Sequence, residues 1–539
     1  MSRNCCSGIS HRIKEIFREN VFELKILLWY TGPLALANFL DYVPIIITTV
    51  FVGHIGKVEL DAMMLAVSYT TLTGIAVGLG LNAACDTLLS QIYGGRNLKF
   101  FGVIMQRAFL ILILACFPCW ALYINAENIL LLCGQNKDVA RQAELCVLVL
   151  LPELPAFFFF QLGLRFLQNQ EVIWPQIAVS CLGILVSTFL NYLLLFVLQI
   201  GVIGGAVAIT VGTFCDCFLL FIYIRIRKLH LATWPGWSIE CLNDWGPFLA
   251  LAIPGVLINM IECWAFEIAM ILAGLINLVE LGGQSLLIQL ITMLIKIPFA
   301  LGIATSLRVG YHLGAGETDR AKKSSKLGLV VAGTLAIFIF ILLIGLRSQL
   351  GKMFVNEKDI LSLVYETIPI CALFYIFTPS VSVFSGALKG IGKPEIAALA
   401  FLFAYCLITF PIGVPLMFLA KLGIKGFWIG MLTAIVSINI YLFIYFWRLD
   451  WNLMTEKVKE RVGLKMKPVP SLEPNIDAPD NIELTNYASL DCTNKETELQ
   501  EMADKAAFQK LLRCRGFQAL AVVSTLFIGL TVKLTVKLH

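Results

Sequence analysis

The sequence predicts an all-α polytopic membrane protein in which two six-helix lobes are followed by a thirteenth C-terminal span. Three observations lead to this fold class. The 539-residue chain is 58 % hydrophobic and 14 % charged, which is too apolar to cover a soluble globule with a hydrated surface. Apolar windows of about 20 residues, the length that crosses roughly 30 Å of hydrocarbon, occur repeatedly along the chain. The first half of the chain also resembles the second half.

The apolar windows give thirteen predicted spans. Basic residues set their orientation, because the short segments on the side of the N-terminus carry 19 Lys and Arg before the twelfth span, against 8 on the opposite side. We therefore expect a cytoplasmic N-terminus, an extracellular C-terminus and, because the first segment has no apolar core, no cleaved signal peptide. The spans lie near residues 26–52, 62–85, 101–124, 145–167, 172–198, 201–225, 246–272, 284–308, 325–346, 361–388, 395–420, 425–447 and 516–532.

The internal repeat has an offset of 221 to 222 residues. Pro33, Asn38 and Asp41 of span 1 align with Pro254, Asn259 and Glu262 of span 7, and GLNAACDTLLSQIYGGRN (80–97) aligns with GIATSLRVGYHLGAGETD (302–319). Six spans per unit leave both halves with the same orientation, so a pseudo-two-fold axis should run along the membrane normal. Parallel repeats of this kind place the substrate site between the halves, near the membrane midplane.

The repeat and the charge pattern define seven segments. They are a cytoplasmic N-terminal segment (1–25), an N-lobe with spans 1 to 6 (26–225), a cytoplasmic inter-lobe loop (226–245), a C-lobe with spans 7 to 12 (246–447), a cytoplasmic linker (448–515), a thirteenth span (516–532) and an external C-terminus (533–539). The linker is rich in Pro, Asn and acidic residues without apolar periodicity, so it is predicted to be mostly disordered.

Three carboxylates fall in the middle of predicted spans. Glu262 and Glu267 lie in span 7 and Asp41 lies in span 1, where an ionised group costs several kcal/mol. Such a group is expected to face a water-filled cavity, where it binds either a proton or a cation. Asn38 and Asn259 precede two of these acids by three residues and share their helical faces, so they either bond within the cavity or pack helices together.

The motifs GLNAACDTLLSQIYGGRN, ELGGQSLLIQLITM, ATSLRVGYHLGAGETDRAKKSS and GALKGIGKPEI resemble those of the multidrug and toxin extrusion (MATE) transporters, from about residue 30 to residue 450. The linker and thirteenth span resemble the animal members. The resemblance implies two lobes arranged as a V that exchange an organic cation for protons or, in some members, sodium. It also implies no bound cofactor.

The resemblance assigns roles to individual residues of span 7. Glu262 and Glu267 match the two glutamates that handle protons and cations, and Trp264 and Phe266 match aromatic positions that line the cavity. An aromatic face beside a carboxylate suits a flat organic cation. Tyr42, directly after Asp41, is placed in the same predicted cavity.

This chain departs from the family pattern at several positions. Gln289 and Thr378 stand where animal relatives typically carry glutamates in spans 8 and 10, and neither can carry a proton near neutral pH, so coupling could be altered or lost. Lys296 lies seven residues after Gln289, on the same face. We hypothesise an ion pair between Lys296 and one of the three acids, which would favour zwitterionic substrates; the alternative is that its side chain reaches the membrane boundary near Pro298.

Other functions fit the sequence less well. The chain has no HExxH, GxSxG or P-loop motif, so we do not expect an enzyme, and its sixteen cysteines lack metal-binding spacing. A lipid-linked sugar flippase should carry several basic residues in its cavity, whereas Lys296 is the one basic residue predicted in the middle of a span. An uncoupled facilitator remains open. The expected partners are small organic cations or zwitterions and the lipid bilayer, with no nucleic acid; we expect a monomer in the plasma membrane.

Overall fold

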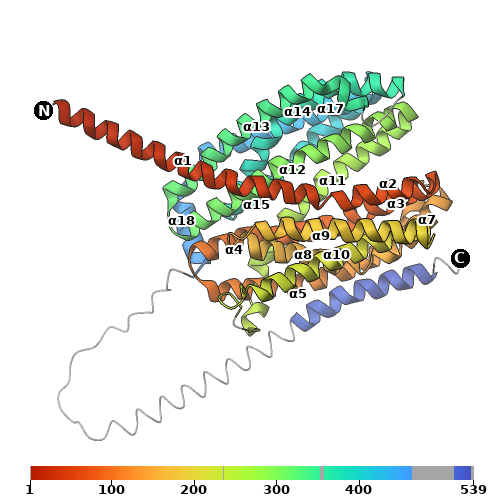
Figure 1. Cartoon of the computed structure of the whole chain (residues 1–539), viewed down its shortest axis with the longest axis horizontal. Helices are drawn as coiled ribbons and strands as arrows, with labels where there is room; N and C mark the ends of the chain where they lie inside the picture. The colour runs from red at the N-terminus through yellow and green to blue at the C-terminus, as the bar shows by residue number, and fades with distance from the viewer. Residues whose placement is uncertain (1, 235, 353–356, 464–514, 536–539) are drawn as a thin grey trace, which may run out of the picture.

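The computed structural model describes residues 2–234, 236–352, 357–463 and 515–535, with side chains from residue 18 onward (Figure 1). Its helices are α1 (Ser2–Leu40), α2 (Val43–Gly53), α3 (Lys57–Thr70), η1 (Thr71–Ile75), α4 (Ala76–Gly94), α5 (Leu98–Ile124), α6 (Ala126–Leu132), α7 (Lys137–Leu150), α8 (Glu153–Gln168), α9 (Trp174–Asn191), η2 (Tyr192–Val197), α10 (Val202–Ile226), η3 (Ile239–Leu242), α11 (Trp245–Ile276), α12 (Leu278–Gly314), α13 (Thr318–Lys352), α14 (Lys358–Ile391), α15 (Pro394–Ala404), η4 (Tyr405–Thr409), α16 (Phe410–Phe418), α17 (Ile424–Trp447) and α18 (Trp451–Arg461).

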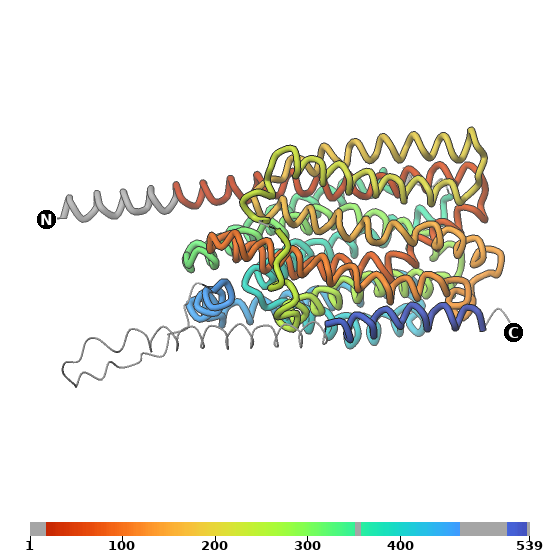
Figure 2. Tube along the Cα trace, turned by 90° about the horizontal axis from the view of Figure 1, so that it is seen from below, coloured from red at the N-terminus to blue at the C-terminus, as the bar shows by residue number. Residues whose placement is uncertain are grey.

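The described residues contain twelve helices that are long and apolar enough to cross a membrane, the last of them Arg515–Thr535. A thirteenth span is formed when α7 and α8, which meet at an angle of 51°, are counted together. The predicted all-α membrane fold is thus confirmed. Figure 2 shows α1 starting at one end of the bundle and the last helix ending at the opposite end, as an odd number of spans requires.

The spans form two lobes with separate hydrophobic cores. One core lies mainly within α3 to α10 and the other within α11 to α17. Figure 1 shows the two groups of helices together at the end near α18 and diverging towards the ends of α2 and α14. We call the end near α18 the closed end.

The first span of the repeat is divided between the lobes. In α1, Leu27, Tyr30 and Leu34 pack mainly against α12 of the C-lobe, whereas α2 packs against α3, α9 and α10 of the N-lobe. The helix breaks at Asp41 and Tyr42, because the ring of Pro44 at the start of α2 cannot continue the preceding helix. Span 7 likewise contacts the opposite lobe, since α11 packs against α4 of the N-lobe. Unlike span 1, it remains one unbroken helix.

Small residues bring the lobes into backbone contact at the closed end. A Cβ on Gly314 of α12 would lie 1.9 Å from the carbonyl oxygen of Gln91 in α4, and one on Gly94 would lie 2.0 Å from the carbonyl oxygen of Tyr311. Gln91 also donates from Nε2 to the carbonyl oxygen of Gly390 at 2.8 Å. No larger residue fits between α4 and α12 without separating the two lobes.

Helix α18 bridges both lobes at the closed end, within the segment predicted as a linker. Trp451, Met454 and Val458 are buried on one face. The hydroxyl of Thr455 lies 2.7 Å from that of Thr318 in the C-lobe, and Arg461 donates to Gln91 of the N-lobe at 3.2 Å. The sequence held a signal for this helix, since the buried residues recur at helical spacing after the Asp450 cap; residues 464–514 of the predicted linker lie outside the described residues.

The last helix, Arg515–Thr535, packs on the outer face of the N-lobe. Asn125 donates to the carbonyl oxygen of Gly529 at 2.9 Å, and Lys533 forms a buried ion pair with Glu144 of α7. Arg515 donates to the carbonyl oxygen of Leu242 at 3.0 Å. None of its described residues lines the cavity described in the next section.

Candidate functional site

A cavity containing about 780 Å³ of space, its open side included, is walled by α11, α12, α14, α15 and α17 of the C-lobe, and Asp86 of α4 is the N-lobe residue in its described lining. Aromatic and aliphatic side chains form most of its wall. The polar groups lining it come from Asp86, Asn259, Glu262, Ser306, Thr378, Ser382, Ser385 and Lys389.

Three of the predicted site residues line this space together, namely Glu262, predicted for proton and cation coupling, and Asn259 and Thr378, predicted for the substrate cavity. Asn259 donates to the carbonyl oxygen of Gly255 at 2.8 Å, and Thr378 donates to that of Phe374 at 3.1 Å, so both are bonded within their own helices. The Glu262 carboxylate accepts no hydrogen bond from any described residue. Its acceptor capacity is therefore available to a ligand or a proton.

Two basic residues beside the cavity were missed by the sequence reasoning. Lys389 lines the cavity because α14 continues to Ile391, past the predicted end of span 10, and Arg165 lies 3.2 Å from Asp86. The helix boundary could have been read from the GIG motif, since Gly392 adopts the left-handed conformation that ends α14. Both residues lie near the ends of their helices, so the prediction of Lys296 as the one mid-span basic residue did not include them.

The other predicted residues of spans 7 and 8 do not line this cavity. Phe266 packs against Trp428 at 6.5 Å between ring centroids, and the Trp264 side chain is 51 % exposed on another face of α11. Glu267 faces Ser68 of α3, in the N-lobe, which agrees with the expectation that it does not pair with Glu262. Gln289 is half-buried on α12, outside the cavity wall.

Asp41 lies in a separate polar network inside the N-lobe. It accepts a hydrogen bond from Ser180 Oγ at 2.6 Å and a longer one from Gln176 Nε2 at 3.4 Å. Gln176 accepts from Gln168 at 2.9 Å, and Gln168 accepts from Arg165 at 2.9 Å. Because Arg165 also pairs with Asp86, the network runs from the break in span 1 to the wall of the cavity.

Lys296 and its neighbours lie beside this network. The Lys296 ammonium group is 5.4 Å from the centroid of the Tyr42 ring, a cation–π arrangement, and no described carboxylate is in ion-pair contact with it. The hypothesised ion pair with Asp41, Glu262 or Glu267 is thus not formed in this conformation. Asn38 Nδ2 is buried without a hydrogen-bond partner among the described residues.

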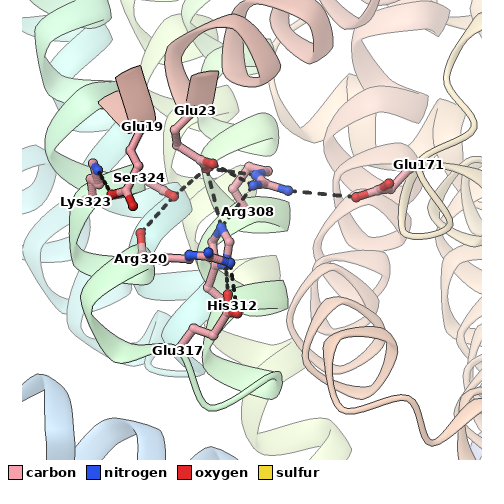
Figure 3. Close-up of polar contacts among 9 residues, drawn as sticks. All are labelled: Glu19, Glu23, Glu171, Arg308, His312, Glu317, Arg320, Lys323 and Ser324. Carbon is pink, nitrogen blue, oxygen red and sulfur yellow. Dashed lines mark hydrogen bonds and ion pairs between the residues drawn. The ribbon is translucent and has the colours of Figure 1, made fainter. Parts of the chain in front are cut away.

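A cluster of charged residues joins α1, α12 and α13 at the closed end (Figure 3). Arg308, the repeat counterpart of Asp86, donates to Glu23 from Nε at 2.9 Å and from Nη2 at 2.7 Å. Ser324 Oγ donates to the same carboxylate at 2.7 Å. Arg308 also reaches Glu171 of the N-lobe at 3.8 Å, so this cluster includes an ion pair between the lobes.

Glu317, in the connection between α12 and α13, completes the cluster. Its carboxylate lies 2.8 Å from His312 Nδ1 and 2.9 Å from Arg320 Nη1. Partial burial raises the pKa of this carboxyl, but the contacts with His312 and Arg320 outweigh it and hold the pKa below its ordinary value.

The chain is similar to known proteins over most of its length. The family model described as MatE matches residues 33–193 and again residues 254–414, with the same 221-residue offset as the repeat. Multidrug and toxin extrusion protein 2 of Mus musculus is 44 % identical over 443 residues, covering 82 % of this chain and 77 % of that protein. Multidrug and toxin extrusion protein 1 of Homo sapiens is 37 % identical over 547 residues, covering 97 % and 95 %.

Solved structures agree with the fold. The crystal structure of the eukaryotic MATE transporter AtDTX14 superimposes with a TM-score of 0.79 at 28 % identity, covering 82 % of this chain and 99 % of that one. A MATE transporter in the bent conformation gives a TM-score of 0.70 at 15 % identity, which bears on the fold alone.

Proposed function

The chain belongs to the multidrug and toxin extrusion family of multi-pass membrane transporters, and from that premise we propose that it exports organic cations in exchange for protons by alternating access. In this proposal the N-terminus is cytoplasmic, the C-terminus is extracellular, and the protein works as a monomer in the plasma membrane. The closed end then faces the cytoplasm, and the two groups of helices diverge towards the extracellular side.

The observation that carries the proposal is the position of Glu262. Glu262 lines the cavity that the C-lobe helices form beside α4 of the N-lobe, and its carboxylate has no hydrogen-bond donor among the described residues. A carboxylate in such surroundings is costly when ionised and unpaired, so it should hold either a proton or a cation. Mutual exclusion of the two ligands at one carboxylate couples export of the cation to entry of the proton.

Glu267 and Asp41 have supporting roles in this proposal. Each lies in a different environment from Glu262, Glu267 beside Ser68 and Asp41 bonded to Ser180. Neither shares the cavity wall with Glu262, so a second coupled cation would bind separately.

A second candidate is a facilitator with altered or absent proton coupling. It is favoured by Thr378, which lines the cavity where the family resemblance leads to an acid, and which donates its hydroxyl to its own helix. Glu262 would then be the one acidic residue of the cavity wall that is not already paired with a basic residue, and sodium could replace the proton as its counter-ion.

The test is uptake of radiolabelled tetraethylammonium into vesicles that contain the purified protein and have an acidic interior. We expect gradient-driven uptake by the wild type and its loss in Glu262→Gln. The matched control is Glu366→Gln, because Glu366 is exposed on α14 and pairs with Lys425 outside the cavity. Uptake that ignores the pH gradient but follows a sodium gradient, or no gradient, would select the second candidate.

A further inference from the structure

The charges of the cavity wall balance one another. Glu262, Asp86 and Lys389 line the cavity, and Asp86 is already neutralised by Arg165 at 3.2 Å. Lys389 has Asp86 and Glu262 as its neighbouring acids, and no described carboxylate is in ion-pair contact with it. One negative and one positive group are therefore left available on the wall of the same cavity.

Ser306 adds an unused hydrogen-bonding group on the side of Lys389. Ser306 lines the cavity, the residue is 1 % exposed, and its buried Oγ has no hydrogen-bond partner among the described residues. The carbonyl oxygen of Ser306 would lie 2.7 Å from a Cβ on Gly390, the residue after Lys389, so α12 and α14 touch at this level. A buried hydroxyl without a partner is costly unless a ligand or water binds it.

The cavity is elongated along α14. Thr378 and Lys389 both line it and are separated by eleven residues, which corresponds to about 16 Å of helix. Phe299, Phe374 and Phe401 supply aromatic surface. Glu262 of α11 lines the same cavity as Lys389 and Ser306, so a ligand bound there has groups of both charges on its wall.

We propose that this cavity is a zwitterion site, in which Glu262 pairs with the cationic group of an aromatic solute while Lys389 and Ser306 bind its carboxylate or sulfonate. This inference rests on the proposed transport function and narrows its substrate class. A simple monovalent cation in the same cavity would be attracted by Glu262 and repelled by Lys389. A zwitterion pairs with Glu262 and with Lys389 and also bonds the Ser306 hydroxyl, so it leaves fewer buried polar groups unpaired than a bound monovalent cation does.

The test compares two permanent ions that differ in one group. Benzyltrimethylammonium is a cation, and (4-carboxybenzyl)trimethylammonium is the zwitterion with the same ring and ammonium group. Uptake of each is measured in proteoliposomes with an acidic interior. We expect the wild type to take up the zwitterion with at least a tenfold higher uptake efficiency than the cation, and a preference for the cation would overturn the inference.

Variants assign the preference to individual residues. Lys389→Met should lower zwitterion uptake about tenfold and raise uptake of the cation, because it removes the group that repels it. Ser306→Ala should lower zwitterion uptake alone, about threefold; this change breaks no hydrogen bond made by the side chain, so it also decides the matter if Lys389→Met does not fold. Lys358→Met, at the exposed start of α14, is the matched control.

The outcomes separate this inference from the proposed function. Equal losses of both solutes in Lys389→Met and in Ser306→Ala would refute the zwitterion site while leaving cation export in place. Gradient-driven uptake of neither solute by the wild type would refute both proposals. Cation uptake that Glu262→Gln abolishes, without a zwitterion preference in the wild type, would sink the zwitterion site alone.

Discussion

Replacing Glu23 by Gln should destabilise the protein by about 3 kcal/mol. Glu23 accepts two charge-assisted hydrogen bonds from Arg308 and one from Ser324, and the side chains of the ion pair are 8 % and 11 % exposed. Removing one partner of a buried ion pair costs about 3–5 kcal/mol, because the other charge stays buried. The lower end applies here, since the amide oxygen of Gln still accepts one bond and Glu171 remains 3.8 Å from Arg308.

The measurement is thermal unfolding of the purified protein in detergent, followed by tryptophan fluorescence. The matched control lies four residues earlier on the same helix, where Glu19 pairs with Lys323 at 2.9 Å with its carboxylate 68 % exposed. An exposed pair of this kind contributes little, so Glu19→Gln should leave the transition unchanged. Equal shifts in the two variants would refute the reasoning from burial.

Three further predictions follow from other contacts of the fold. Gly314→Ala should lower both stability and transport because its Cβ would lie 1.9 Å from a carbonyl oxygen of α4, whereas Gly333→Ala, whose Cβ meets nothing within 4 Å, should change neither; similar losses in both would contradict this. The pKa of Glu317 is lowered in the folded state, so its carboxylate stabilises the fold at pH values above the ordinary pKa of 4.5, and this stabilisation is lost as the pH falls towards the folded-state pKa. Glu317→Gln should therefore flatten the pH dependence of thermal unfolding in this acidic range. An unchanged slope would argue against this role of Glu317. Lys533→Met should lower the free energy of unfolding by about 3 kcal/mol, because it leaves the Glu144 carboxylate, 7 % exposed, buried without its partner. Adding Glu144→Leu should restore most of that stability in a double-mutant cycle, and strictly additive losses would exclude the coupling.

Span number, the two-lobe architecture and the repeat could be predicted from the sequence, because each depends on patterns within one stretch of chain or between two aligned stretches. The length of an apolar segment determines whether it spans a membrane, and this holds wherever the segment packs. The family model matches two copies at the same offset that Pro33 and Pro254 indicated.

The contents of the cavity were less predictable, because they depend on which helix faces meet. The position of Glu262 in a cavity could be predicted, because an ionised carboxylate exposed to hydrocarbon is too costly and must therefore face the interior of the protein. Trp264 shares its helix but points elsewhere, and Lys389 enters the wall because α14 runs past the predicted end of its span. The pairing of Glu23 with Arg308 joins residues 285 positions apart, and no local pattern contains that information.

The break in span 1 makes the two halves of the repeat mechanically unequal. The α1 side of the break is attached mainly to the C-lobe and the α2 side to the N-lobe, so a rotation of one lobe relative to the other concentrates backbone torsion at Asp41 and Tyr42. Asp41, bonded to α9, therefore sits at the joint itself, where a change in its hydrogen bonds acts on the angle between the two segments. Glu262 lies within the continuous helix α11, so a change in its interactions acts on that helix as one rigid unit and not on an angle between two segments.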